Sequence, residues 1–493
     1  MKKITLLIVL FLIGCQNESS TKLNLNNLFN DHMVLQQDTL VSFWGQATKG
    51  VKVNLHCSWG VQATTVADET GNWVVQLNTP KADNKSHTVT VKSKKNTIKI
   101  QDVLLGEVWL ASGQSNMEMP MKGFRYARIH ELVEGAEEEI ANANYPEIRM
   151  FTVKRIIAFE SQENTEGNWA VCSPETLGEF SAVAYYFGKK LYEELNVPIG
   201  LIHSSFGGSP AESWVRLDFI EKIKGFENTS KRLEIANDPK TPYNKWVAKH
   251  TSVKLESLIE VDNFKWVDET HFEFLSSDYN DDAWQDATVA SIGEAFEKDD
   301  FNGIGWIRQQ LNIESLPQGD LVFDLGETDD LYTIYINGEM IGRKEYWGVA
   351  SNRYTFSSDV LKKGQNTIAI RFIDVWGEGG LNVDRNRGIY IKDKKIIALN
   401  EDWKLNRVCY LSGGDFYKLE SNDEEIPLAS PDRMPHQSNS PTTLNNGMIA
   451  PLVPYTIKGF IWYQGESNEQ RAEEYKTLFP AVIDSWRAQW KNE

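Results

Sequence analysis

The sequence predicts a multidomain protein in which an α/β unit, built on a parallel sheet, is combined with all-β units. Its 493 residues are enough for about three domains. Apolar runs at 103–111, 199–203 and 457–463 each end in small and polar residues, as buried parallel strands do at a ligand-binding sheet edge. Residues 23–101 and 261–407 contain short alternating runs between turn residues, which is typical of antiparallel sheets.

The first residues predict a leader peptide and no folded domain. Two lysines precede the apolar stretch 4–13, which is too short to span a bilayer as a mature helix. The next residues, Leu-Ile-Gly-Cys at 12–15, resemble a bacterial lipobox. Cleavage before Cys15 and lipidation of its thiol are therefore expected, with residues 1–22 forming the signal peptide and polar tether. A plain secretory signal is the alternative.

Residues 23–102 are predicted to form a β-sandwich. Apolar and polar residues alternate over short runs at 40–44, 51–57, 73–77 and 88–91. This part carries no constellation of catalytic residue types, so we expect it to be structural.

Residues 103–260 are predicted to be the first part of the α/β domain. Residues 181–196 have the pattern of an amphipathic helix, with apolar residues at every fourth position (Val183, Phe187, Leu191 and Leu195). A strand, this helix and the next strand make a βαβ unit, which implies a parallel sheet with a right-handed crossover.

Residues 261–411 are predicted to be an inserted β-domain. Strands are expected at 306–313, 320–325, 331–341, 366–372 and 388–399. The pair Asn337-Gly338 is a strong signal for a two-residue hairpin turn.

The α/β domain is expected to resume at 412 and to run to 493. Its last helix is predicted to start at Ser467, where the next residues fit a capping box. Pro480 should kink or split this helix.

Three loops carry the residue types of a serine hydrolase. Ser115 follows the first apolar run, Gly207 and Gly208 follow the second, and Gln464 follows the third. A nucleophile, backbone donors and a carboxamide can meet at one sheet edge. For any single loop an ordinary turn or helix cap is the simpler interpretation, but the three together favour catalysis.

The loops resemble those of the sialate O-acetylesterase family of SGNH-type hydrolases. The resemblance lies in GQSNMEMPM (113–121), SSFGGSPAESW (204–214) and WYQGESN (462–468), and also in NLFNDHMVLQ (27–36) and LNNGMIAPLVPY (444–455). It implies an SGNH, flavodoxin-like hydrolase domain after a β-sandwich. The inserted β-domain resembles the jelly rolls found beside the catalytic domains of β-galactosidases.

The resemblance implies a role for each motif residue. Ser115 would be the nucleophile, with its own N–H helping to hold the oxyanion; its alternative role is a helix cap. Gly207 or Gly208 would give a second backbone donor, or simply a tight turn. Gln464 would be the side-chain donor, or a carboxamide that satisfies the loop backbone.

Three further residues are assigned support or substrate contact. Glu466 would order Gln464, bond to the loop or contact the substrate. Glu212 and Trp214 lie in a family motif, although Trp214 is equally well a core residue.

The general base is the one catalytic group that the motifs do not supply. In this family it comes from a C-terminal Asp-x-x-His segment well beyond the WYQGESN motif, and residues 469–493 contain none. The segment Asp268 to His271 matches the Asp-x-x-His pattern but lies in the inserted β-domain. His203 and His436 are nearer the three motifs in the sequence. The catalytic Asp/His pair is thus not found, and a truncated copy, or a base from elsewhere, is expected.

Composition limits the partners. With 51 Lys and Arg against 69 Asp and Glu, the net charge of −18 argues against nucleic acid and anionic membrane surfaces, but not against an anionic sugar. After Cys15 is set aside, Cys57, Cys172 and Cys409 are widely spaced, which favours buried free thiols over a single disulfide. No metal-ligand cluster or cofactor motif is present.

The expected activity is that of a carbohydrate O-acetylesterase, most specifically a sialate O-acetylesterase, on the bacterial cell envelope. Ser115 would attack the acetyl carbonyl and form an acetyl-enzyme. A deacetylase of xylan or pectin would use the same chemistry. A non-catalytic glycan-binding lipoprotein is the alternative from another class, because the Asp-x-x-His segment is missing. A glycosidase would leave the Ser115 motif unexplained.

Overall fold

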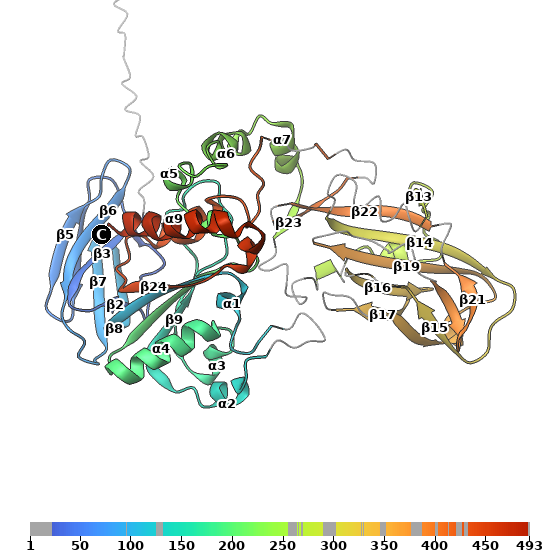
Figure 1. The fold of residues 1–493 in the computed structure, drawn as a ribbon, viewed down its shortest axis with the longest axis horizontal. Coiled ribbons are helices and arrows are strands. Elements are labelled where there is room, and N and C mark those ends of the chain that lie inside the picture. Colours follow the sequence, from blue (N-terminus) through green and yellow to red (C-terminus); the bar gives the residue numbers. More distant parts are fainter. Residues whose placement is uncertain are drawn as a thin grey trace, which may run out of the picture.

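The computed structural model describes residues 22–94, 96–124, 132–254, 264, 266–267, 270–288, 302–326, 328, 330–345, 352–375, 387–399, 403–412, 414–420, 426–427 and 432–491. The predicted lipidation site, Cys15, and Asp268 of the Asp268–His271 segment lie outside these residues. Figure 1 shows a first β-unit on the left, a mixed α/β unit in the centre and a second β-unit on the right.

One long strand, β8 (Asn96–Gly113), runs through both the first β-unit and the α/β unit. Its first half pairs antiparallel with β7 (His87–Ser93). Its second half pairs parallel with β11 (Ile199–Ser205) on one side and β24 (Gly459–Tyr463) on the other. The domain boundary predicted at 102/103 therefore falls inside a continuous strand.

The first β-unit consists of two sheets. One contains β1 (Asn24–Leu25), β3 (Thr39–Gln46) and β6 (Asn72–Thr79), and the other contains β4 (Lys52–Cys57), β5 (Gln62–Val66), β7 and the start of β8. Alternate residues of β6 are buried, as its sequence pattern predicts. The short strand β2 (Val34–Gln36) runs parallel to β8 at the junction of the two units.

The α/β unit has the strand order β10 (Trp169–Cys172), β9 (Tyr145–Thr152), β11, β8, β24. The predicted helix at 181–196 is confirmed as α4 (Ala182–Leu195), which packs on β11. The helix α9 (Ala472–Trp490) covers the opposite face (Figure 1). Its residue Trp486 packs against Phe460 and Trp462. Among the described residues β24 pairs only with β8, so its outer edge carries no strand.

Shorter helices connect these elements. They are α1 (Ser115–Glu118), α2 (Ala136–Ala141), α3 (Pro174–Leu177), α5 (Leu217–Ile220), α6 (Thr229–Asn237) and α7 (Pro242–Lys249). In the described part of the chain, no helix is both long and apolar enough to span a membrane.

The second β-unit also has two antiparallel sheets. The larger has the order β12 (Ser252–Lys254), β23 (Asp415–Lys418), β22 (Trp403–Ser412), β14 (Gly303–Ile313), β19 (Gly364–Asp374), β16 (Leu331–Ile336), β17 (Glu339–Lys344), with β13 (Gln285–Ala287) beside β22. The smaller contains β18 (Arg353–Ser357), β15 (Asp320–Asp324), β20 (Gly388–Ile391) and β21 (Lys394–Ala398).

Two features of this unit bear on the sequence predictions. Asn337 and Gly338 have φ angles of 51° and 86° between β16 and β17, which confirms the predicted hairpin turn. The pairing of β12 with β23 extends the larger sheet beyond the predicted limits of 261–411.

The predicted start of the last helix is wrong. Residues Glu466–Arg471 form a 3-10 turn, and α9 begins only at Ala472 with no side-chain cap at Arg471. The polar side chains of the turn bond to other loops instead of capping the helix. Pro480 lies inside an unbroken α9.

The cysteine prediction is confirmed. Cys57, Cys172 and Cys409 are free and buried. Burial raises the pKa of each thiol to about 12.

Gly106 allows the backbone at Pro198 to pass close to the middle of β8. A Cβ atom there would lie 1.9 Å from the carbonyl oxygen of Pro198, which accepts the N–H of Glu107 at 2.9 Å. We expect Gly106→Ala to lower the free energy of unfolding by about 1–3 kcal/mol, the range for overpacking. Gly178→Ala is the control, because its Cβ would have only ordinary contacts at 3.8 and 4.0 Å. Thermal unfolding of both variants tests this; equal midpoints would contradict it.

Candidate functional site

The three predicted loops leave the same edge of the central sheet. Ser205 at the end of β11 and Tyr463 at the end of β24 both lie opposite Gly113, the last residue of β8. The loops that follow these strands therefore emerge side by side, although they are far apart in the sequence (Figure 1).

Gly113 makes this convergence possible. Its φ is 144°, and a Cβ atom would lie 2.0 Å from the carbonyl oxygen of Tyr463. That oxygen accepts the N–H of Gln114 at 3.0 Å, while Gly113 itself accepts the N–H of Phe206 at 3.0 Å. A side chain at this position would push the three loops apart.

Ser115 is the first residue of α1 and is partly exposed. Gln114, not Ser115, is the N-cap, and no side chain caps this helix. The Gln114 side chain accepts the N–H groups of Gly465 (3.3 Å) and Ser467 (3.1 Å), which joins the first loop to the third. The alternative role of Ser115 as a helix cap is thus not the one that the structure shows.

Glu118, one helical turn after Ser115, holds the second loop. Its Oε2 accepts the N–H of Gly207 at 2.5 Å, and its Oε1 pairs with Arg155. Neither residue was predicted from the sequence, although the i to i+3 spacing places Glu118 on the same side of the helix as Ser115.

The two glycines of the second loop therefore differ. The N–H of Gly207 is occupied by Glu118. Gly208 is exposed with φ of 70°, and its N–H donates no hydrogen bond to the described residues. Of the two glycines, Gly208 carries the N–H that can receive a ligand.

Gln464 is buried behind the loops. Its Nε2 donates to Asn468 Oδ1 at 2.7 Å and to the carbonyl oxygen of Ser209 at 3.3 Å. Both N–H bonds of the carboxamide are therefore used, the second at the long end of the normal range.

Glu212 anchors the same group of side chains. Its carboxylate, only 4% exposed, accepts from Asn468 Nδ2 at 3.0 Å and from Arg471 Nη2 at 2.6 Å. Asn468 and Arg471 are further residues that the sequence did not single out; both belong to the turn after Gln464.

Trp214 and Glu466 differ in burial. Trp214 is fully buried, donates to Ser209 Oγ at 2.9 Å and packs against Trp462, so it supports the second loop from beneath. Glu466 is exposed, and its carboxylate accepts from Asn116 Nδ2 at 2.5 Å. It links the first and third loops without bonding to the Gln464 side chain.

The candidate histidines have other partners. His203 is buried on β11, with its Nε2 2.6 Å from Ser205 Oγ. His436 Nε2 donates to the carbonyl oxygen of Ile157 at 2.9 Å, and His271 stacks on Phe274 in the second β-unit. Within the described ranges no histidine hydrogen-bonds to Ser115.

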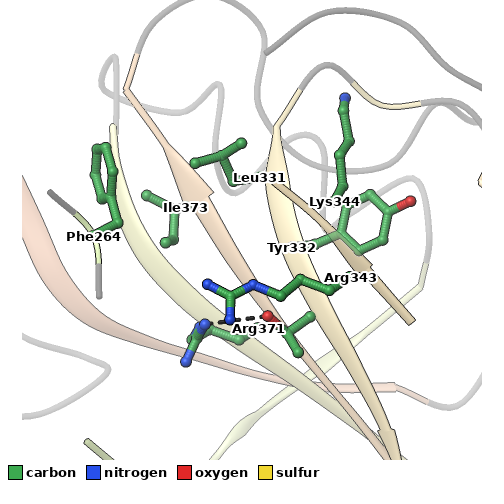
Figure 2. A pocket seen from close by; sticks show the side chains of 8 residues that line it. Phe264, Leu331, Tyr332, Arg343, Lys344, Arg371 and Ile373 are labelled. Carbon is green, nitrogen blue, oxygen red and sulfur yellow. Dashed lines mark hydrogen bonds between the residues drawn. The ribbon is translucent and has the colours of Figure 1, made fainter. Parts of the chain in front are cut away.

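Figure 2 shows a small pocket in the second β-unit, apart from these loops. Arg343, Lys344 and Arg371 lie around it. The guanidinium of Arg371 donates to Val267 O (3.0 Å) and Thr333 Oγ1 (3.1 Å), and Lys344 Nζ donates to Thr328 O at 2.5 Å. These cationic groups are thus tied to oxygen atoms of the protein itself.

Comparisons with known proteins agree with the motif resemblance. The chain is 29% identical over 250 residues to the sialate O-acetylesterase of Rattus norvegicus, covering 47% of this chain and 44% of that protein. It is 33% identical over 203 residues to the sialate O-acetylesterase of Homo sapiens, covering 38% of this chain and 37% of that protein. The matched regions thus span less than half of each relative. No family model matches the chain.

Among solved structures, a carbohydrate acetylesterase from Xanthomonas citri aligns with 95% of this chain and 57% of its own, at 19% identity and a TM-score of 0.47. The sequence comparisons give the relationship: over 38–47% of its length, the chain is a homologue of the sialate O-acetylesterases.

Proposed function

We propose that the protein is a carbohydrate O-acetylesterase that hydrolyses acetyl esters on sugars, with O-acetylated sialic acid as its substrate. The observation that carries the proposal is the strand register, which brings Ser115, the Gly208 N–H and the Gln464 carboxamide to one sheet edge. The homology to sialate O-acetylesterases supports the choice of substrate.

In this mechanism Ser115 Oγ attacks the acetyl carbonyl carbon. The carbonyl oxygen gains the negative charge and is held by the N–H groups of Ser115 and Gly208. The general base, which took the proton of Ser115 during the attack, gives it to the sugar oxygen as the tetrahedral intermediate collapses, and the acetyl group stays on Ser115. Water then attacks this ester and releases acetate, which regenerates the free hydroxyl.

Gln464 is proposed as the third donor. Its bond to Asn468 is short, whereas its bond to the carbonyl oxygen of Ser209 is long at 3.3 Å. The second N–H can therefore leave the Ser209 oxygen and donate to the developing oxyanion at a small cost in free energy. Hydrogen bonds at a catalytic site often tighten only with bound substrate.

We propose a histidine as the general base, because a neutral imidazole can take the proton of Ser115 near neutral pH. His203 is unsuited to the role. Burial, followed by the nearby charge of Arg155, lowers its pKa to about 3, so it is a weak base that bonds to Ser205 instead.

The proposed function also implies a fold type for each of the three units. We infer that the parallel strands β9, β11, β8 and β24 form an SGNH, flavodoxin-like hydrolase core. The unit before it would be a β-sandwich, and the second β-unit would be a jelly roll of the kind that accompanies β-galactosidases. The arrangement of each β-unit as two antiparallel sheets supports these assignments.

Ser115→Ala tests the nucleophile. We expect acetate release from p-nitrophenyl acetate and from O-acetylated sialic acid to fall about a thousandfold or to background, because the acetyl-enzyme cannot form without the Ser115 hydroxyl. Ser230→Ala, an exposed serine on α6, is the matched control and should retain full activity. Folded wild-type protein that releases no acetate, or Ser115→Ala protein that still turns over, would contradict the proposal. Faster turnover of acetylated xylan or pectin would overturn the choice of substrate.

His203 predicts a stability that depends on pH. The pKa is about 3 in the folded state and about 6.5 in the unfolded state, so between these values the unfolded state binds more protons. The stability contributed by neutral His203 is present above pH 6.5 and is lost as the pH falls below it. We expect His203→Gln to weaken the fall of the thermal midpoint between pH 6.5 and 5. His56→Gln, on the exposed side of β4, should behave like wild type; identical slopes for all three would be contrary to this expectation.

We also propose that Cys15 is lipidated and anchors the protein to the bacterial cell envelope. The lipobox-like residues 12–15 after an apolar stretch support this. In cells fed a labelled fatty acid, we expect the wild-type protein to carry the label and to sediment with membranes. Cys15→Ser should abolish both, and a labelled or membrane-bound variant would refute the anchor.

A further inference from the structure

We infer that Glu212 and Asn468 are positioning residues that set the direction of the Gln464 carboxamide, an inference that rests on the proposed function. Glu212 comes from the 3-10 turn at Ala211–Trp214 in the second loop, and Asn468 comes from the third loop. Their side chains meet at 3.0 Å across 256 residues of sequence.

The direction follows from which atoms can donate. An ionised carboxylate only accepts hydrogen bonds, so Asn468 must turn its Nδ2 toward Glu212. Its Oδ1 then faces the other way, where it receives the backbone N–H of Ala211 at 2.9 Å and Gln464 Nε2 at 2.7 Å. Since that oxygen only accepts, Gln464 must present its amine end.

The direction of the Gln464 carboxamide affects the oxyanion. With one N–H held by Asn468, the other points to the carbonyl oxygen of Ser209, in the loop that also carries Gly208. Without the Asn468 bond the carboxamide is free to turn its oxygen toward this loop. A negative dipole end would then face the oxyanion, which destabilises the transition state.

Arg471 stabilises the negative charge of the Glu212 carboxylate. A carboxylate that is 4% exposed needs charge-assisted partners, and the Arg471 guanidinium supplies one at 2.6 Å. The other N–H₂ side of Arg471 pairs with the more exposed Glu474 at 2.7 Å. Glu474 thus touches the same arginine without touching Asn468.

The test compares Glu212→Gln and Asn468→Leu with Glu474→Gln. We expect the first two to lower kcat for acetate release about ten- to a hundredfold with KM within about twofold, because the lost orientation acts on the transition state. Glu474→Gln should match wild type. A change confined to KM, or an equal loss in the Glu474 variant, would overturn the inference.

A second measurement does not depend on activity. Asn468→Leu and Gln464→Met remove the same hydrogen bond, so their shifts of the thermal midpoint should be less than additive in the double variant. If wild-type protein shows no Ser115-dependent acetate release, the proposed function fails but this cycle still decides whether Asn468 and Gln464 are coupled. Additive shifts would refute the coupling, and Glu212→Gln provides the conservative variant should Asn468→Leu not fold.

Discussion

The structure depends on the continuity of β8. Its first half belongs to the antiparallel sheet of the first β-unit, and its second half is an inner strand of the parallel sheet, between β11 and β24. One hydrophobic core runs along this strand, from Trp73 and Val75 in the first β-unit to Val108 and Trp486 in the α/β unit. The first β-unit is therefore part of the scaffold that holds the end of β8, and with it Ser115, in place.

The site is held by polar side chains whose charges and hydrogen-bond directions are matched between loops. Glu118 uses one carboxylate oxygen for the Gly207 N–H and the other for Arg155. Glu212 is likewise shared between Asn468 and Arg471. In both cases a carboxylate from one loop satisfies donors of another, so that the loops are positioned before any substrate binds. Such preorganised donors are what an oxyanion requires, because water would have to reorient to stabilise the same charge.

The helix α7 contacts the strands β22 and β23 of the second β-unit. The ring of Trp246 on α7 packs against Tyr410 and Tyr417, and Tyr243 bonds to Ser412. The cationic side chains that line its pocket are bonded to oxygen atoms of the same unit.

Local sequence determined most elements of this protein. The helix at 182–195, the hairpin turn at Asn337-Gly338 and the positions of the three motifs at strand ends could all be predicted, because periodicity and turn propensity act over a few residues. The start of α9, the extent of β8, the free N–H of Gly208 and the direction of the Gln464 carboxamide could not. Each of these is decided by a partner far away in the sequence, such as Glu118 for Gly207 or Glu212 for Asn468, and only the tertiary structure brings such partners within hydrogen-bond distance.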